Sequence, residues 1–179
     1  MKDRKLATRY ARALLTSLPQ EQAEAADGFL SAIREALHES PEFRDLLFDP
    51  AVPRAARKAV LRSLADQNGM TRQISNFLAT VVDHNRTSSL PSIAEVFHEE
   101  REKAMGIVPA EITTAFPLTP DLKKRTLHVL EQITGRKVRL TANVEQGLLG
   151  GAVTKIGSTV HDGSLRTQLA QLRRRMTQE

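Results

Sequence analysis

Apolar side chains recur at helical spacing along the first 105 residues of the chain. One segment shows the pattern clearly, because Ile74, Phe77, Leu78, Val81 and Val82 follow the i, i+3, i+4, i+7, i+8 spacing of a single helix face. The predicted helices span residues 3–17, 20–38, 41–48, 53–67, 72–84 and 90–104. Only short turns separate them, so this part of the chain predicts a six-helix bundle.

The first predicted helix has an unusually wide apolar face, covering an arc of about 200°. The residues on this arc are Leu6, Ala7, Tyr10, Ala11, Ala13, Leu14, Leu15 and Leu18. Two interpretations remain open. The helix is deeply buried within the bundle, or one edge of the arc receives a helix from a partner protein.

After Gly106 the period changes from that of a helix to that of a strand. Alternating residues predict strands over 108–116, 138–144 and 152–160, with Ala152, Thr154, Ile156, Ser158 and Val160 facing the core. A helix over 120–134 should turn Leu122, Thr126, Val129, Leu130 and Ile133 inward. The sequence therefore predicts a mainly helical α+β protein. Its domains are residues 1–105, a helical bundle, and residues 106–179, a small α/β domain.

Four residues are predicted to cap helices through their hydroxyl groups. Ser40 and Thr119 each precede a proline, Thr71 precedes the fifth helix, and Ser164 follows Asp162-Gly163. The last of these begins a terminal helix with a stripe of Leu165, Leu169, Leu172 and Met176.

Composition is that of an ordinary globular protein, with 40% hydrophobic residues, 26% charged residues and a net charge of +5. The chain has no cysteine, which excludes disulfides and thiolate chemistry and fits a reducing compartment. No apolar run approaches the ~18 residues that a membrane span requires. Any membrane association should therefore come through partners.

No arrangement of residues points to catalysis, a metal ion or a cofactor. Lys155 lies in a predicted strand, and the Gly-Lys-Ser/Thr of a phosphate-binding loop is missing. His98-Glu99 lacks the second histidine of a zinc motif, because that position is Glu102. His161, Asp162 and Ser164 are neighbours in sequence, but turn formation already explains the last two. We expect a protein that is not an enzyme.

Basic residues cluster at Arg54/Arg57/Lys58/Arg62, at 123–125, at 136–139 and at 173–175. Binding of nucleic acid is the alternative function that such clusters suggest. Acidic residues are interspersed among them and no aromatic side chains lie between them for base stacking. Solvated surfaces are the simpler interpretation.

The C-terminal motif resembles a known family. Gly150-Gly151 leads into a strand, and Asp162-Gly163-Ser164 into a helix rich in leucine and arginine. This order is similar to the signature of the delta subunit of F-type ATP synthases, the family of the mitochondrial oligomycin-sensitivity-conferring protein. The segment 9–14, Arg-Tyr-Ala-Arg-Ala-Leu, is similar to the opening of the same family. The resemblance covers nearly the whole chain.

The resemblance implies a non-catalytic stator subunit in the peripheral stalk of a proton-translocating ATP synthase. One copy per complex would sit at the cytoplasmic side of the bacterial membrane, attached to that membrane only through the complex. Its first and fifth helices would bind the N-terminal helix of an α subunit. The residues implied there are Tyr10, Ala13, Leu14, Leu78, Val81, Val82 and Asn85. The C-terminal domain would bind the b subunits. The residues implied there are Gly150, Gly151, Asp162, Gly163, Ser164, Leu165, Leu169 and Leu172.

Overall fold

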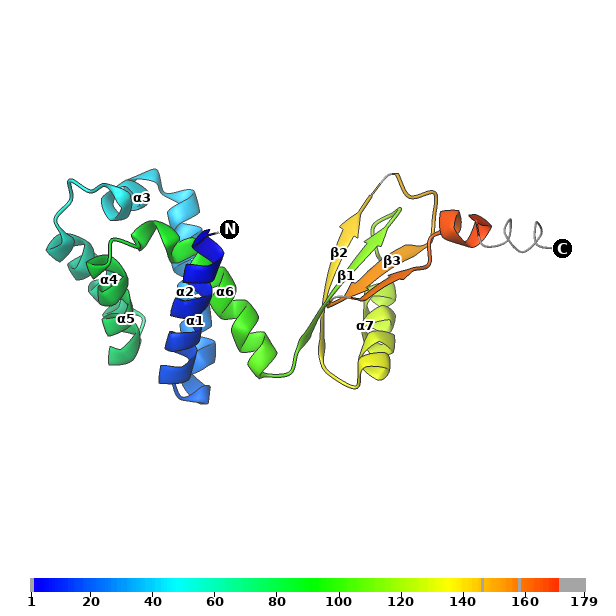
Figure 1. The fold of residues 1–179 in the computed structure, drawn as a ribbon, viewed down its shortest axis with the longest axis horizontal. Coiled ribbons are helices and arrows are strands. Elements are labelled where there is room, and N and C mark those ends of the chain that lie inside the picture. Colours follow the sequence, from blue (N-terminus) through cyan, green and yellow to red (C-terminus); the bar gives the residue numbers. More distant parts are fainter. Residues whose placement is uncertain (1, 146, 158, 171–179) are drawn as a thin grey trace. The chain divides into compact units, whose positions relative to one another are not determined.

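The computed structural model describes residues 2–145, 147–157 and 159–170. Contacts within the chain divide it into two compact units, Met1–Arg101 and Glu102–Glu179. The first unit is helical and the second is built on a sheet, as the ribbon in Figure 1 shows. This confirms the predicted α+β fold.

The helices of the first unit match the apolar periodicity closely. Their bounds are α1 Lys2–Ser17, α2 Gln20–Glu39, α3 Pro41–Phe48, α4 Arg54–Gln67, α5 Arg72–Asp83 and α6 Leu90–Ala104, with a 3₁₀ turn η1 at Thr87–Ser89. A continuous core draws apolar side chains from all six helices, from Ala7 on α1 to Phe97 on α6. The division between the units falls in the last turn of α6. Glu102 is the first residue of the second unit, and its buried carboxylate pairs with Arg139 of the same unit (2.7 Å).

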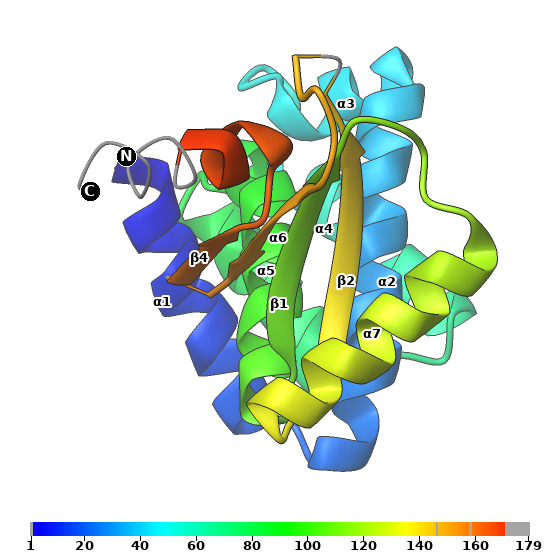
Figure 2. The same cartoon turned by 90° about the vertical axis from the view of Figure 1, so that its right-hand side faces the viewer.

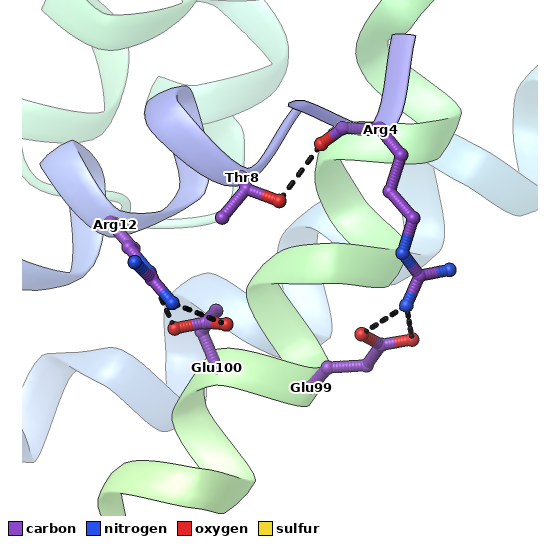
Figure 3. Close-up of polar contacts among 5 residues, drawn as sticks. All are labelled: Arg4, Thr8, Arg12, Glu99 and Glu100. Carbon is purple, nitrogen blue, oxygen red and sulfur yellow. Dashed lines mark hydrogen bonds and ion pairs between the residues drawn. The ribbon is translucent and has the colours of Figure 1, made fainter. Parts of the chain in front are cut away.

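Two ion pairs tie α1 to α6 along the outside of the bundle. Figure 3 shows Nη2 of Arg4 donating to both carboxylate oxygens of Glu99, at 2.9 and 2.7 Å. Two turns further along α1, Nε of Arg12 donates to Glu100 at 2.8 Å. The hydrogen bond to Glu100, and then its charge, raise the pKa of Arg12. Two arginines of the polar side of α1 are therefore engaged in contacts within the unit.

Three of the four predicted caps form. Ser40 Oγ accepts from the backbone N–H of Phe43 (3.2 Å), Thr119 Oγ1 from that of Leu122 (3.3 Å), and Ser164 Oγ from that of Thr167 (3.3 Å). Thr71 is the N-cap residue of α5, as predicted, but its buried hydroxyl makes no hydrogen bond. The Thr71 carbonyl closes that first turn by accepting from the backbone N–H groups of Ile74 and Ser75.

The second unit is a four-stranded sheet with one helix packed against it. The elements are β1 Val108–Thr114, α7 Pro120–Thr134, β2 Val138–Val144, β3 Ala152–Ile156 and β4 Thr159–Asp162, in the sheet order β2-β1-β3-β4. β1 and β2 are parallel and joined through α7, whereas β1–β3 and β3–β4 are antiparallel. Figure 2 shows α7 crossing one face of β1 and β2. The small core lies between them, at Ala110, Ile112, Leu130, Val138 and Leu140.

The single strand predicted over 152–160 is wrong. Gly157 adopts φ +57°, a left-handed conformation that suits a turn, and it ends β3. The chain then returns as β4, with Val153 paired to Asp162 and Thr154 to His161. Ala152 and Ile156 pack against the core as expected, but Val160 is exposed, and Ser158 lies outside the described residues. A hairpin and a long strand share the same period of two, so only the turn distinguishes them.

The inward face predicted for α7 is also largely wrong. Leu130 is buried and Leu127 packs beside it, but Leu122, Val129 and Ile133 are exposed, with Ile133 68% accessible. The helix carries apolar residues on two faces, and a sheet can cover only one of them. The exposed face, Leu122, Val129 and Ile133, is called the outer stripe of α7 below.

Candidate partner-binding surfaces

Tyr10 and Phe77 bring α1 and α5 together at the surface of the first unit. Their rings meet edge to face, with centroids 6.2 Å apart and planes at 71°. Both side chains are half-buried and pack against the helical core. Ala13, one turn beyond Tyr10 on α1, is exposed. These three residues form an apolar seam between two helices, which is the kind of surface on which a third helix can pack.

The residues predicted for the α-subunit site fall into two layers. Leu14, Leu78, Val81 and Val82 are fully buried core residues. Tyr10 and Ala13 lie above them at the seam, and Asn85 is exposed just beyond the end of α5, in a left-handed conformation with φ +53°. The buried four therefore fix the spacing of α1 and α5 rather than offering contact surface. The sequence pattern grouped Phe77 with the core residues of α5. Half-buried and fully buried residues recur at the same helical spacing, so periodicity alone does not distinguish them.

The glycine turn and the Asp-Gly-Ser turn of the second unit are packed against each other. A Cβ built on Gly151 would lie 2.4 Å from the Gly163 carbonyl oxygen, and one on Gly150 would lie 2.7 Å from Leu165 Cδ1. The Gly150 carbonyl accepts from the N–H of Leu165 (3.0 Å), and the Ala152 carbonyl from that of Gly163 (2.9 Å). Glycine is needed at Gly151 so that the two turns can approach, because the atom that a Cβ would meet there is backbone.

Asp162 organises the start of the last helix from the end of β4. Its Oδ1 accepts from the Ser164 N–H (2.9 Å) and its Oδ2 from the Thr167 hydroxyl (2.8 Å). The hydrogen bond from the Ser164 backbone, then those from the Ser164 and Thr167 side chains, hold the pKa of this carboxyl below its ordinary value of 3.8. The signature residues Gly150, Gly151, Asp162, Gly163 and the buried Ser164 thus form a brace, called the signature brace below.

The brace directs the helix that begins at Leu165. Residues 165–170 are helical, and both Leu165 and Leu169 are exposed, Leu169 by 61%. Leu172, Met176 and the arginines at 173–175 lie outside the described residues. The described part of the stripe is therefore an apolar surface available to a partner.

The described part of the chain offers no sign of a catalytic or metal site. No group of three or more His, Asp or Glu side chains is gathered there to hold a metal ion. Within the same residues, no helix has the length and apolar character needed to cross a membrane. What the structure presents is a set of surfaces on two compact units.

Comparison with known proteins identifies what kind of protein has this architecture. The family described as ATP synthase delta (OSCP) subunit matches residues 6–176. The delta subunit of Anaeromyxobacter dehalogenans is 35% identical over 174 residues, covering 97% of each chain. That of Myxococcus xanthus is 35% identical over 176 residues with the same coverage. A chain in the cryo-EM structure of the Toxoplasma gondii mitochondrial ATP synthase hexamer has a TM-score of 0.66 and 25% identity, over 96% of this chain and 97% of that one.

The chain belongs to the ATP synthase delta (OSCP) subunit family. It is a stator subunit of an F-type ATP synthase, and it takes part in ATP synthesis and proton transport without carrying out the catalysis itself. Membership of this family favours the stator over the nucleic-acid-binding alternative.

Proposed function

We propose that each unit makes one joint of the stator. The helical unit binds the amphipathic N-terminal helix of an α subunit over the seam of α1 and α5. The second unit binds the C-terminal ends of the b subunits through the last helix, which the signature brace positions. One copy per complex, peripheral at the cytoplasmic side of a bacterial membrane, then holds the catalytic head still while the rotor turns.

The seam supports the first joint. Tyr10, Ala13 and Phe77 present apolar surface to solvent on two adjacent helices, and the core residues Leu14 and Leu78 hold those helices at a fixed spacing. Aromatic side chains in such a position bury a large area when a partner helix covers them. Arg4 and Arg12 of α1 already pair with α6, whereas the apolar residues at the seam have exposed surface for a partner.

Exposed apolar residues support the second joint. In the described part of the second unit, Phe116, Leu149, Leu165 and Leu169 are all substantially exposed, in addition to the outer stripe of α7. A small unit with so much uncovered apolar surface is typical of a protein that is covered in its complex. The brace keeps Leu165 and Leu169 accessible because it fixes the first turn of their helix to the sheet.

Ala13→Asp tests the first joint without disturbing the core, because Ala13 is exposed. We expect affinity for a synthetic peptide of the α-subunit N-terminal helix to fall at least tenfold, which is ~1.4 kcal/mol, since burying an unpaired carboxylate costs more than burying an uncharged polar group. The matched control is Ala59→Asp, an exposed mid-helix alanine on α4. Calorimetric titration gives both affinities, and circular dichroism checks that both variants fold.

Equal affinity of the two folded variants would place the α-subunit joint elsewhere.

The second joint is tested by Leu169→Asp in the complete complex. We expect ATPase activity to leave the membrane pellet at moderate salt, because the joint to the stalk is weakened. Activity that stays in the pellet and remains sensitive to a proton-channel blocker would remove Leu169 from the joint.

A further inference from the structure

Arg57, in the second turn of α4, is a buried cation with no counter-charge. It is only 5% exposed, and among the described residues it is the only lysine or arginine classed as buried. Its Nε donates to the Val52 carbonyl (3.1 Å), and no described carboxylate pairs with it. Its neighbour Lys58, by contrast, reaches the Asp83 carboxylate. The basic cluster of α4 is therefore not simply a solvated surface.

Arg57 lines a pocket of about 410 Å³ where the α3–α4 loop meets the segment after α5. The pocket wall has an apolar side and a polar side. The apolar side is Phe48, Pro50, Val52 and Pro53; the polar side is Arg54, Arg57, Asn85, Thr87 and Ser88. No acidic residue lines the pocket.

Thr87 is a second buried polar residue with an unused group in this pocket. It is 4% exposed, and its hydroxyl makes no hydrogen bond to any described residue. Arg54 stands at the rim, exposed in the first turn of α4, where the positive end of the helix dipole adds to its charge. Two guanidinium groups, two hydroxyls and a side-chain amide therefore line the pocket.

Burying an ionised guanidinium without an opposing charge is unfavourable. An anion that enters the pocket supplies the opposing charge and so reduces this unfavourable free energy. The terminal nitrogens of arginine form a planar fork that matches carboxylate and phosphate oxygens. The apolar side of the pocket lowers the local dielectric constant, which strengthens such contacts.

We propose that this pocket binds one oxyanion group, a carboxylate or a phosphate. Arg57 would donate through its terminal nitrogens, Thr87 through its hydroxyl, and Arg54 would supply charge at the rim. The inference does not depend on either stator joint. The probes below distinguish a phosphoryl group from a carboxylate.

The test is a ¹H–¹⁵N NMR titration of the full chain with inorganic phosphate and, separately, with acetate, at constant ionic strength set by chloride. We expect saturable shifts of the Thr87 and Ser88 amides and of the Arg57 Nε–H. Thr87→Val should weaken binding by about tenfold or more, the usual effect of losing a hydrogen bond to a charged group. Arg54→Gln should also weaken binding, because it removes a positive charge at the rim. These two variants carry the test, because Arg57→Gln also removes the contact that holds the α3–α4 loop.

Arg62→Gln is the matched control, an exposed arginine on the same helix that lines a different pocket. Its affinity for either probe should equal that of the parent chain. Tighter binding of phosphate identifies a phosphoryl group as the preferred ligand, and comparable binding of acetate shows that a carboxylate suffices; both uphold the oxyanion site. Shifts that stay linear with concentration, or that weaken equally in Arg62→Gln, overturn it.

Discussion

The Gly151 backbone lies against the Gly163 carbonyl so closely that a Cβ on Gly151 would be 2.4 Å from that oxygen. Both glycines belong to the signature brace, and the oxygen is backbone, so it cannot move aside as a flexible side chain would. The family signature in this chain is thus explained by packing: two turns from different parts of the sequence can meet only when one of them lacks a side chain.

Gly151→Ala should therefore destabilise the second unit by ~2 kcal/mol or more, from the clash and from a φ of +81°. Gly157→Ala is the control, since Gly157 also has positive φ but no atom near its Cβ position. It should cost only ~1–2 kcal/mol of backbone strain. Denaturant unfolding of the two variants gives the comparison, and equal losses would mean that the approach of the turns is not what requires glycine.

Acid should loosen the signature brace at a pH set by Asp162. Because its pKa is lowered in the folded protein, the carboxylate stabilises the brace above the ordinary value of 3.8. That contribution is lost as the pH falls through the lower folded pKa. We expect the Ser164 amide signal to titrate with a midpoint below 3.8 in an NMR series. The step should vanish in Asp162→Asn, and a midpoint at or above 3.8 would contradict the hydrogen bonds assigned to this carboxylate.

The two apolar faces of α7 should respond differently to truncation. Leu130→Ala removes a buried side chain from a small core and should cost ~2–5 kcal/mol of stability. Ile133→Ala, one turn away on the outer stripe, should change the stability of the free protein by less than ~0.5 kcal/mol. Thermal unfolding measures both. A large loss for Ile133→Ala would show that another part of the chain covers the outer stripe.

The pair Arg4–Glu99 should contribute modestly to the attachment of α1. Both side chains are partly exposed, so a double-mutant cycle with Arg4→Met and Glu99→Met should give a coupling of ~0.2–1 kcal/mol. Salt screens such pairs, because the Debye length becomes shorter as the ionic strength rises. The coupling energy should therefore be smaller in about 0.5 M salt than in about 0.05 M salt. A coupling that does not depend on salt would imply a shielded pair.

Residues 1–105 should fold without the rest of the chain. The core of the helical unit draws on residues from Ala7 to Phe97, and no strand contributes to it. We expect a fragment ending at Met105 to be helical by circular dichroism and to unfold cooperatively. Arg139→Gln in the full chain is measured alongside the fragment. This substitution removes the ion pair between Arg139 and Glu102 without truncating the chain. A fragment that melts without a transition would mean that residues 1–105 are not a domain.

Much of this protein could be predicted from the order of its residues. The helical stripes of the first unit, the change of period at Gly106 and the caps at Ser40, Thr119 and Ser164 are local features. Each depends on spacing or on side chains within a few positions, so the sequence determines it directly. The family motif belongs here too, because its glycines and its Asp-Gly-Ser turn are read in order along the chain.

Contacts between residues that are far apart in the sequence, and the burial that results from them, were decided by the tertiary structure. Periodicity shows that Leu130 and Ile133 are both apolar, but the sheet covers only one face of α7, and the strand pairing determines which. Periodicity also shows that α5 is amphipathic. The packing of α1 against α5 then leaves Phe77 at the seam and buries Leu78. In the same way, Arg57 reads as one cation of a surface cluster, and it becomes buried because the α3–α4 loop and Thr87 close over it. Burial depends on what the rest of the chain brings to a residue, and the local sequence does not contain that information.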